Sequence, residues 1–198
     1  TDALLRYSDD MLNEAVGGLS CMDEENMREP EDAKISDYTS GGYTIIKEDE
    51  GTVDAPVGRH PIDRKKMAIN HKNGKEAVTH YKVLERFGNA TYIECRLETG
   101  RTHQIRVHMA WIGHPLFNDE RYGGDRILKG TTFAKYRQFI ENCFAVMPRH
   151  ALHARLLGFE HPATHENVLF ESPLPADFQS LLTKWNIYTS AAKETEEN

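Results

Sequence analysis

Two neighbouring segments with alternating side chains constrain the fold of this chain more than any other feature of its sequence. In the segment 91–98 (TYIECRLE), isoleucine, cysteine and leucine alternate with tyrosine, glutamate and arginine. The segment 77–87 (AVTHYKVLERF) has the same period of two, which is the period of a β-strand. The pair Gly88 and Asn89 stands between them and is a hairpin-turn signal. The sequence therefore predicts an antiparallel strand pair here.

Loop and then helix are predicted for the stretch after this strand pair. Thr102 can cap the helix, and Gly113 followed by a proline ends it. Arg106 lies off the apolar stripe of this helix, so Arg106 and His103 can face a cleft while the stripe faces the core. The residues of the stripe are Ile105, Met109 and Ile112.

The second half of the chain mixes a helix, a strand pair and another helix. Residues 131–147 have apolar side chains at helical spacing, and we interpret them as a core helix rather than an aromatic binding stripe. The segments 150–159 and 166–171 are predicted as a strand pair, and Pro175 permits a helix start. No regular βαβ alternation is present, so we expect an α+β fold with a mixed, largely antiparallel sheet over 75–172 and flanking helices.

The ends of the chain are more acidic and less periodic in sequence than its middle. Residues 1–50 are expected to hold a short amphipathic helix (1–12) and an acidic, disordered insertion within 13–47. Residues 51–185 form the folded portion, beginning with an ordered, turn-rich loop that presents basic side chains. The acidic tail 186–198 is expected to be disordered.

Charge is divided unevenly along the 198 residues. Residues 1–54 carry a net charge of −11 and residues 156–198 a net charge of −5, whereas residues 55–155 carry +9, from 18 Lys and Arg against 9 Asp and Glu. A polyanion can bind such a basic middle despite the overall net charge of −7. A scatter of these charges over a solvated surface is the alternative.

The sequence lacks the patterns of a membrane span, an export leader, a disulfide framework and a metal site. No apolar run approaches the ~18 residues of a membrane span, and no basic-then-apolar leader opens the chain. The 3 cysteines are far apart, which favours reduced thiols, and we expect a cytoplasmic monomer. The histidines form no HExxH pattern, so no metal site is expected.

The block TGRTHQIRVH (99–108) gathers two arginines, a glutamine and two histidines around one helix start. Free backbone N–H groups and the helix dipole favour an anion at that place, and Arg106 can hold a carboxylate or phosphate with two parallel bonds. The alternative is that Arg101 and Arg106 pair with surface acids such as Glu98.

Five blocks of the chain together resemble one known family. They are DAPVGRHPIDRKKMA (54–68), GKEAVTHYKVLERF (74–87), CRLETGRTHQIRVHMAWIGHPL (95–116), DERYGG (119–124) and ALHARLLGFEHPATHENVLFESPLPADF (151–178). With these blocks, residues 51–182 closely resemble the RluA-like family of RNA pseudouridine synthases, the type that modifies large-subunit ribosomal RNA.

The resemblance implies the catalytic-domain fold of these synthases and the isomerisation of uridine to pseudouridine without a cofactor. The target uridine is flipped out of its stack, and an ionised aspartate acts on the ribose. Arg106 matches the basic partner that keeps this aspartate ionised. The partner molecule is RNA, and no membrane is involved. The substrate-binding residues implied are Arg59, His60, Arg64, Lys65, Arg101, His103 and Gln104.

The chain departs from the family pattern at its front. The family's His-Arg-Leu-Asp motif, which holds the nucleophilic aspartate, has no match, and the chain opens on Thr1 rather than methionine. The family's base-stacking tyrosine also has no good match, Tyr43 being the nearest. We therefore expect an incomplete copy of the domain, in which Arg106 lacks its acidic partner and Glu98 and Asp119 are surface or turn residues. A non-catalytic RNA-binding remnant is the alternative function.

Overall fold

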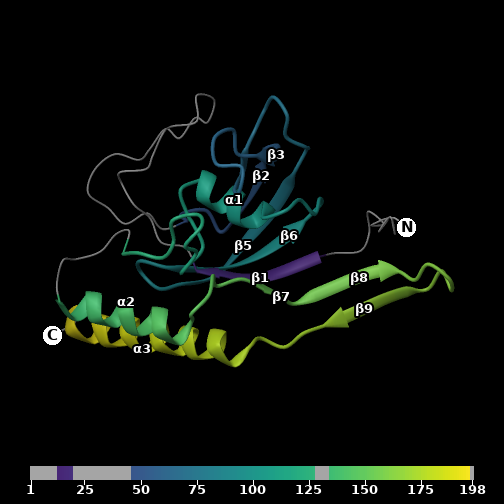
Figure 1. The fold of residues 1–198 in the computed structure, drawn as a ribbon. Coiled ribbons are helices and arrows are strands. Elements are labelled where there is room, and N and C mark those ends of the chain that lie inside the picture. The colour runs from purple at the N-terminus through teal and green to yellow at the C-terminus, as the bar shows by residue number, and fades with distance from the viewer. Residues whose placement is uncertain (1–12, 20–45, 128–133, 197–198) are drawn as a thin grey trace.

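The computed structural model of the chain describes residues 13–19, 46–127 and 134–196. Its centre is a five-stranded sheet in the order β2-β5-β6-β1-β7, in which every neighbouring pair is antiparallel (Figure 1). This arrangement confirms the expected α+β class. The strands of the sheet are β1 (Asn13–Leu19), β2 (Glu50–Asp54), β5 (Val78–Arg86), β6 (Thr91–Leu97) and β7 (His153–Ala154).

Two short hairpins and three helices complete the described structure. One hairpin, β3–β4, stands beside α1, and the other, β8–β9, projects from the sheet as a ribbon (Figure 1). The helices α2 and α3 lie side by side. The bounds are β3 (Val57–Arg59), β4 (Met67–Ile69), β8 (Leu156–Glu160), β9 (Asn167–Glu171), α1 (Gln104–Trp111), α2 (Ala134–Val146) and α3 (Ala176–Glu196).

The hairpin β5–β6 forms where the alternating pattern predicts it. Tyr81 stands opposite Cys95 in the register, and the Phe87 N–H donates to the Ala90 carbonyl over 2.8 Å to close the turn. Gly88 has a φ of 78°, a backbone conformation that glycine adopts without steric cost. The strand prediction and the turn prediction are both confirmed.

Helix α1 packs its apolar face on this sheet. Ile105 and Met109 of the helix lie in one core cluster with Ile93 and Cys95 of β6. The end of the helix is as predicted, with Gly113 at φ 86°. Its beginning differs from the prediction.

The helix cap is His103, at φ 58°, and not Thr102. No side chain caps the helix in the ordinary way. Instead the Gln104 side-chain oxygen accepts the Arg101 N–H over 2.9 Å, which satisfies a backbone donor just ahead of the helix. The Thr102 prediction, which rested on residue type, is therefore wrong, because the chain enters the helix through the left-handed His103 and no side chain caps it.

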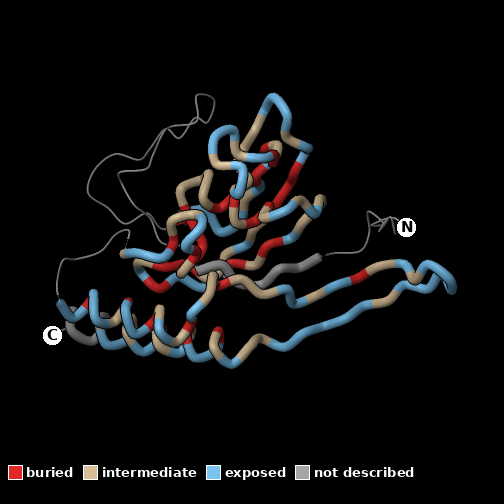
Figure 2. Tube along the Cα trace, in the orientation of Figure 1, coloured by how far each residue is buried: buried red, intermediate tan, exposed pale blue. Residues whose placement is uncertain are grey.

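A second core joins α2 and α3 to the turn of the β5–β6 hairpin. Tyr136, Ile140 and Cys143 of α2 are buried, as the helical spacing predicts, and they pack in one cluster with Phe87 and Trp185. Figure 2 shows the buried residues concentrated where α1 meets the sheet and along the α2–α3 contact. None of the described helices is both long enough and apolar enough to cross a membrane.

Three expectations about the less regular segments were wrong. Residues 13–19, expected within the disordered insertion, form β1, because backbone pairing to both β6 and β7 needs no side-chain periodicity. Residues 51–69 hold β2, β3 and β4 rather than one loop. The tail continues α3 to Glu196, because its Ala, Lys and Glu residues favour helix. The predicted helix 1–12 and residues 20–45 of the insertion, Tyr43 included, lie outside the described residues.

Candidate functional site

The side chains of Arg106 and Asp119 form a two-pronged ion pair. Arg106 Nε lies 2.8 Å from Asp119 Oδ2, and Nη2 lies 2.7 Å from Oδ1. The Arg106 side chain is 12% exposed and that of Asp119 is fully buried. Parallel charge-assisted bonds of this kind fix the plane of the guanidinium. The expectation of an unpaired Arg106 is therefore wrong, although its partner Asp119 is not the nucleophilic aspartate that the resemblance implies.

Asp119 owes its position to the turn that it begins. Its Oδ1 also accepts the backbone N–H groups of Arg121 and Tyr122, at 3.1 and 3.3 Å. The expectation of a turn residue is confirmed, whereas the expectation of a surface residue is wrong. Because both carboxylate oxygens are engaged and buried, Asp119 holds Arg106 in place and has no oxygen exposed for attack on a substrate.

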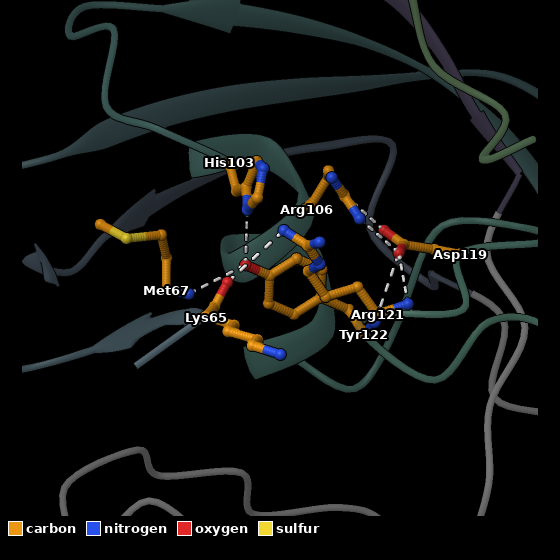
Figure 3. Close-up of polar contacts among 7 residues, drawn as sticks. All are labelled: Lys65, Met67, His103, Arg106, Asp119, Arg121 and Tyr122. Atoms are coloured by element: carbon orange, nitrogen blue, oxygen red, sulfur yellow. Dashed lines mark hydrogen bonds and ion pairs between the residues drawn. The ribbon is translucent and has the colours of Figure 1, made fainter. Parts of the chain in front are cut away.

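Tyr122 is the second support of Arg106. The guanidinium carbon lies 4.9 Å from the centre of the Tyr122 ring, which is cation–π geometry. The Tyr122 hydroxyl accepts the Met67 N–H over 3.1 Å and lies 2.9 Å from His103 Nδ1 (Figure 3). This one side chain thus connects β4, the first residue before α1 and the arginine.

The surroundings keep the histidines of this cluster neutral. Burial, followed by the charges of Arg106 and Arg121, lowers the pKa of His103. Burial and Arg106 likewise lower the pKa of His150. Burial raises the pKa of Tyr122, so its hydroxyl keeps its proton. That hydroxyl accepts the Met67 N–H, so donation of its own proton to His103 Nδ1 would place the ring proton of His103 on Nε2.

Sequence reasoning assigned no role to Asp119, Tyr122 or His150. The first two belong to the DERYGG block, which the resemblance marked but did not interpret. A carboxylate and an aromatic ring just after a predicted helix that carries Arg106 were a usable signal. Nothing in the sequence around His150 points to the cluster.

Four of the predicted substrate-binding residues lie on or next to the β3–β4 hairpin. Arg59, Arg64 and Lys65 are exposed, and the Arg59 side chain donates to the Arg64 carbonyl over 3.3 Å. His60 lines an open pocket beside α1, and its Nδ1 accepts backbone N–H groups of the hairpin loop. The structure thus brings the basic residues of this segment together at one hairpin.

Arg101 and Gln104 are held by the fold at the other side of the helix start. Arg101 Nε donates to the Glu76 carbonyl over 2.9 Å. Gln104 is 2% exposed, and its amide nitrogen donates to the Val78 carbonyl over 2.9 Å and to Thr79 over 3.1 Å. Its oxygen is engaged as well, so the position of Gln104 favours a structural role over RNA contact. The alternative pairing of Arg101 with Glu98 is also absent among the described contacts, since Glu98 bonds to His80.

Neither thiol chemistry nor a protein-bound metal has support in the described part of the chain. Burial raises the pKa of the Cys95 thiol to about 12 and that of Cys143 to about 11, so both remain protonated. Within residues 46–127 and 134–196 no three His, Cys, Asp or Glu side chains gather as metal ligands.

Several known proteins are similar in sequence to this chain. Residues 34–111 match the family described as RNA pseudouridylate synthase. Ribosomal large subunit pseudouridine synthase D of Pseudomonas aeruginosa is 50% identical over 137 residues, which is 67% of this chain and 40% of that protein. An uncharacterized RNA pseudouridine synthase of Bacillus subtilis is 46% identical over 145 residues, 73% of this chain and 42% of that protein. The chain belongs to the RluA-like family of RNA pseudouridine synthases.

Solved structures of pseudouridine synthases share the fold of this family member. Human RNA pseudouridylate synthase domain containing 1 superposes with a TM-score of 0.54 at 24% identity, covering 86% of this chain and 59% of that one. Human RNA pseudouridylate synthase domain containing 4 gives 0.52 at 19% identity, with 90% and 63% covered. The chain spans about 40% of the length of the curated pseudouridine synthases that it matches.

Proposed function

We propose that this chain is the RNA-binding, arginine-carrying part of a pseudouridine synthase that acts on large-subunit ribosomal RNA. The observation that carries the proposal is the fixed Arg106 guanidinium. Asp119 engages two of its five N–H groups, and Nη1 bonds to none of the described residues. The remaining N–H groups can therefore hold a second carboxylate, which in the synthases is the nucleophilic aspartate.

The chemistry of Arg106 in this proposal is electrostatic. A guanidinium within ~4–6 Å of a carboxylate lowers the pKa of that carboxyl group and keeps it ionised at neutral pH. The plane of Arg106 is already set by Asp119 and Tyr122, so the second carboxylate meets an arginine that needs no rearrangement. Arg59, His60, Arg64, Lys65 and Arg101 supply phosphate contacts, which position RNA rather than read its sequence.

A second candidate, RNA binding without catalysis, applies to these 198 residues taken alone. It is favoured by the burial of Asp119, because the acid at the site cannot reach a ribose. The relatives are named for ribosomal RNA of the large subunit, which supports RNA as the partner and the cytoplasm as the location. We also propose that the protein is a monomer.

The test is tritium release from ribosomal RNA transcribed with uridine tritiated at C5. We expect no release by the 198 residues alone. Fusing them behind the front portion of the Pseudomonas aeruginosa synthase, which supplies its aspartate motif, should give turnover. In that fusion, Arg106→Ala should lower kcat far more than RNA affinity, and Arg106→Lys should fall between, since lysine keeps the charge and loses the planar fork. Release by the bare chain, or an unaffected Arg106→Ala fusion, contradicts the proposal.

A further inference from the structure

An open pocket of about 670 Å³ lies between α1, β4 and the turn that follows Asp119. Its floor is apolar and includes Met67, Ala110 and Trp111. Its rim carries three permanent cations, Lys66, Arg121 and Arg126, and two acids, Glu120 and Asp125. The pocket shares the Tyr122 side chain with the Arg106 cluster and therefore adjoins it.

The walls of the pocket are tied to each other. The Tyr122 hydroxyl accepts the Met67 N–H over 3.1 Å, and Arg121 Nη1 lies 3.4 Å from the Lys65 carbonyl (Figure 3). These two contacts join the turn after Asp119 to the β3–β4 hairpin. The floor comes from the core-packed helix α1 and from β4. The pocket is consequently formed before any ligand arrives, which reduces the entropy cost of binding.

The chemistry of the pocket fits a nucleotide better than a free anion. Unpaired bases bind apolar and aromatic surfaces, and basic side chains beside such surfaces take the phosphates. The hairpin next to the rim adds the exposed cations Arg59, Arg64 and Lys65. Glu120 and Asp125 weaken the attraction for a small free anion, so a ligand that also covers the floor is favoured.

We propose that this pocket holds an unpaired RNA nucleotide that flanks the target uridine, with its base against Trp111 and Met67 and its phosphate at the Lys66 and Arg126 rim. The proposal rests on the proposed function, because it takes RNA as the ligand. It adds a second nucleotide position beside Arg106. Docking on this position would fix the distance between the RNA backbone and the arginine.

The 2 tryptophans of the chain give a direct readout. Trp185 is fully buried in the α2–α3 core, whereas Trp111 lines the pocket. A base stacked on Trp111 should quench its fluorescence and leave Trp185 unchanged. The probe is a short oligouridine, and the same oligomer without bases separates stacking from phosphate binding. The anisotropy of a dye-labelled oligomer reports binding independently, and thermal unfolding confirms that each variant is folded.

The variant Ala110→Met fills the floor without changing any charge, and Ala176→Met makes the same substitution at an exposed position of α3. We expect Ala110→Met to weaken oligouridine binding about tenfold and to abolish quenching. Ala176→Met should bind like the unmodified chain, and Trp111→Phe should remove the signal.

Three outcomes would overturn the proposed nucleotide position and leave RNA binding intact. They are equal quenching in Ala110→Met, quenching by the base-free oligomer, and oligouridine binding without quenching. Absence of any RNA binding by the folded chain would overturn the pocket and the proposed function together.

Discussion

His103 and Tyr122 are joined by a hydrogen bond between the imidazole Nδ1 and the phenolic hydroxyl. His103 Nδ1 lies 2.9 Å from the Tyr122 hydroxyl, and the two rings meet edge to face with their centres 5.7 Å apart. His103 also has a left-handed backbone, which is uncommon for a residue other than glycine. With the Tyr122 hydroxyl as donor to Nδ1, the ring proton of His103 stands on Nε2, where it can be donated to a ligand.

Replacing Tyr122 by phenylalanine tests this arrangement. The ring and its contact with Arg106 remain, whereas the hydrogen bonds to His103 and to the Met67 N–H are lost. Burial and the charges of Arg106 and Arg121, which lower the pKa of His103, remain in this variant, so the imidazole should stay neutral while the balance between its Nδ1–H and Nε2–H forms changes. Nitrogen-15 NMR of the histidine ring measures both effects. The control is Tyr188→Phe in α3, and an unchanged His103 spectrum in Tyr122→Phe would contradict the assignment.

The Arg106–Asp119 pair should contribute more to stability than an exposed pair of the same geometry. Asp119→Asn leaves a mostly buried guanidinium without its counter-charge, which should cost about 3 kcal/mol of unfolding free energy. In the comparison pair, the Arg149 side chain is 37% exposed and the Asp177 side chain 29% exposed. Asp177→Asn breaks this pair and should cost about 1 kcal/mol of unfolding free energy or less. Urea denaturation of both variants decides the point, and equal losses would speak against it.

Stability should fall as the pH drops from about 6.5 to about 4, partly because of His114. Burial lowers the pKa of His114 from 6.5 to about 4, so between these values the unfolded chain binds a proton that the folded chain does not. The unfolding free energy therefore rises with pH across this window, by up to about 3 kcal/mol from this residue.

In the variant His114→Asn the same pH series should be flatter between pH 4 and 6.5. The exposed His71 provides the matched control, since His71→Asn should leave the slope unchanged. Identical slopes in the His114→Asn variant and the unmodified chain would remove His114 as the cause.

RNA binding should weaken with salt, and the β3–β4 hairpin should account for part of that dependence. Each neutralised phosphate contributes a slope of about −0.7 in log K against log salt for single strands. Replacing both Arg64 and Lys65 by glutamine should make the slope shallower by about 1.4. Lys135→Gln with Arg137→Gln on α2 removes the same charge elsewhere, and an equal change there would show that net charge, rather than the hairpin, is responsible.

Much of the architecture follows from local sequence patterns. The β5–β6 hairpin, the end of α1 and the core face of α2 were predictable, because alternation, a glycine signal and helical spacing act over a few residues. The segment of β1 was not predictable in this way. Its two glycines accompany an irregular register against β6 between Val16 and Gly18, and the strand is held by backbone pairing on both sides.

The sequence by itself determined the family, the basic middle of the chain and the presence of Arg106 on a helix. Only the tertiary structure decided what Arg106 does. The chain turns back at Gly113, and this turn brings Asp119, which is 13 residues after Arg106, against the guanidinium. It also turned Gln104 inward, where the carbonyl of Val78 on a neighbouring strand captures its amide. Charge and periodicity are properties of the sequence, whereas the choice of an ion-pair partner depends on which groups the fold buries together.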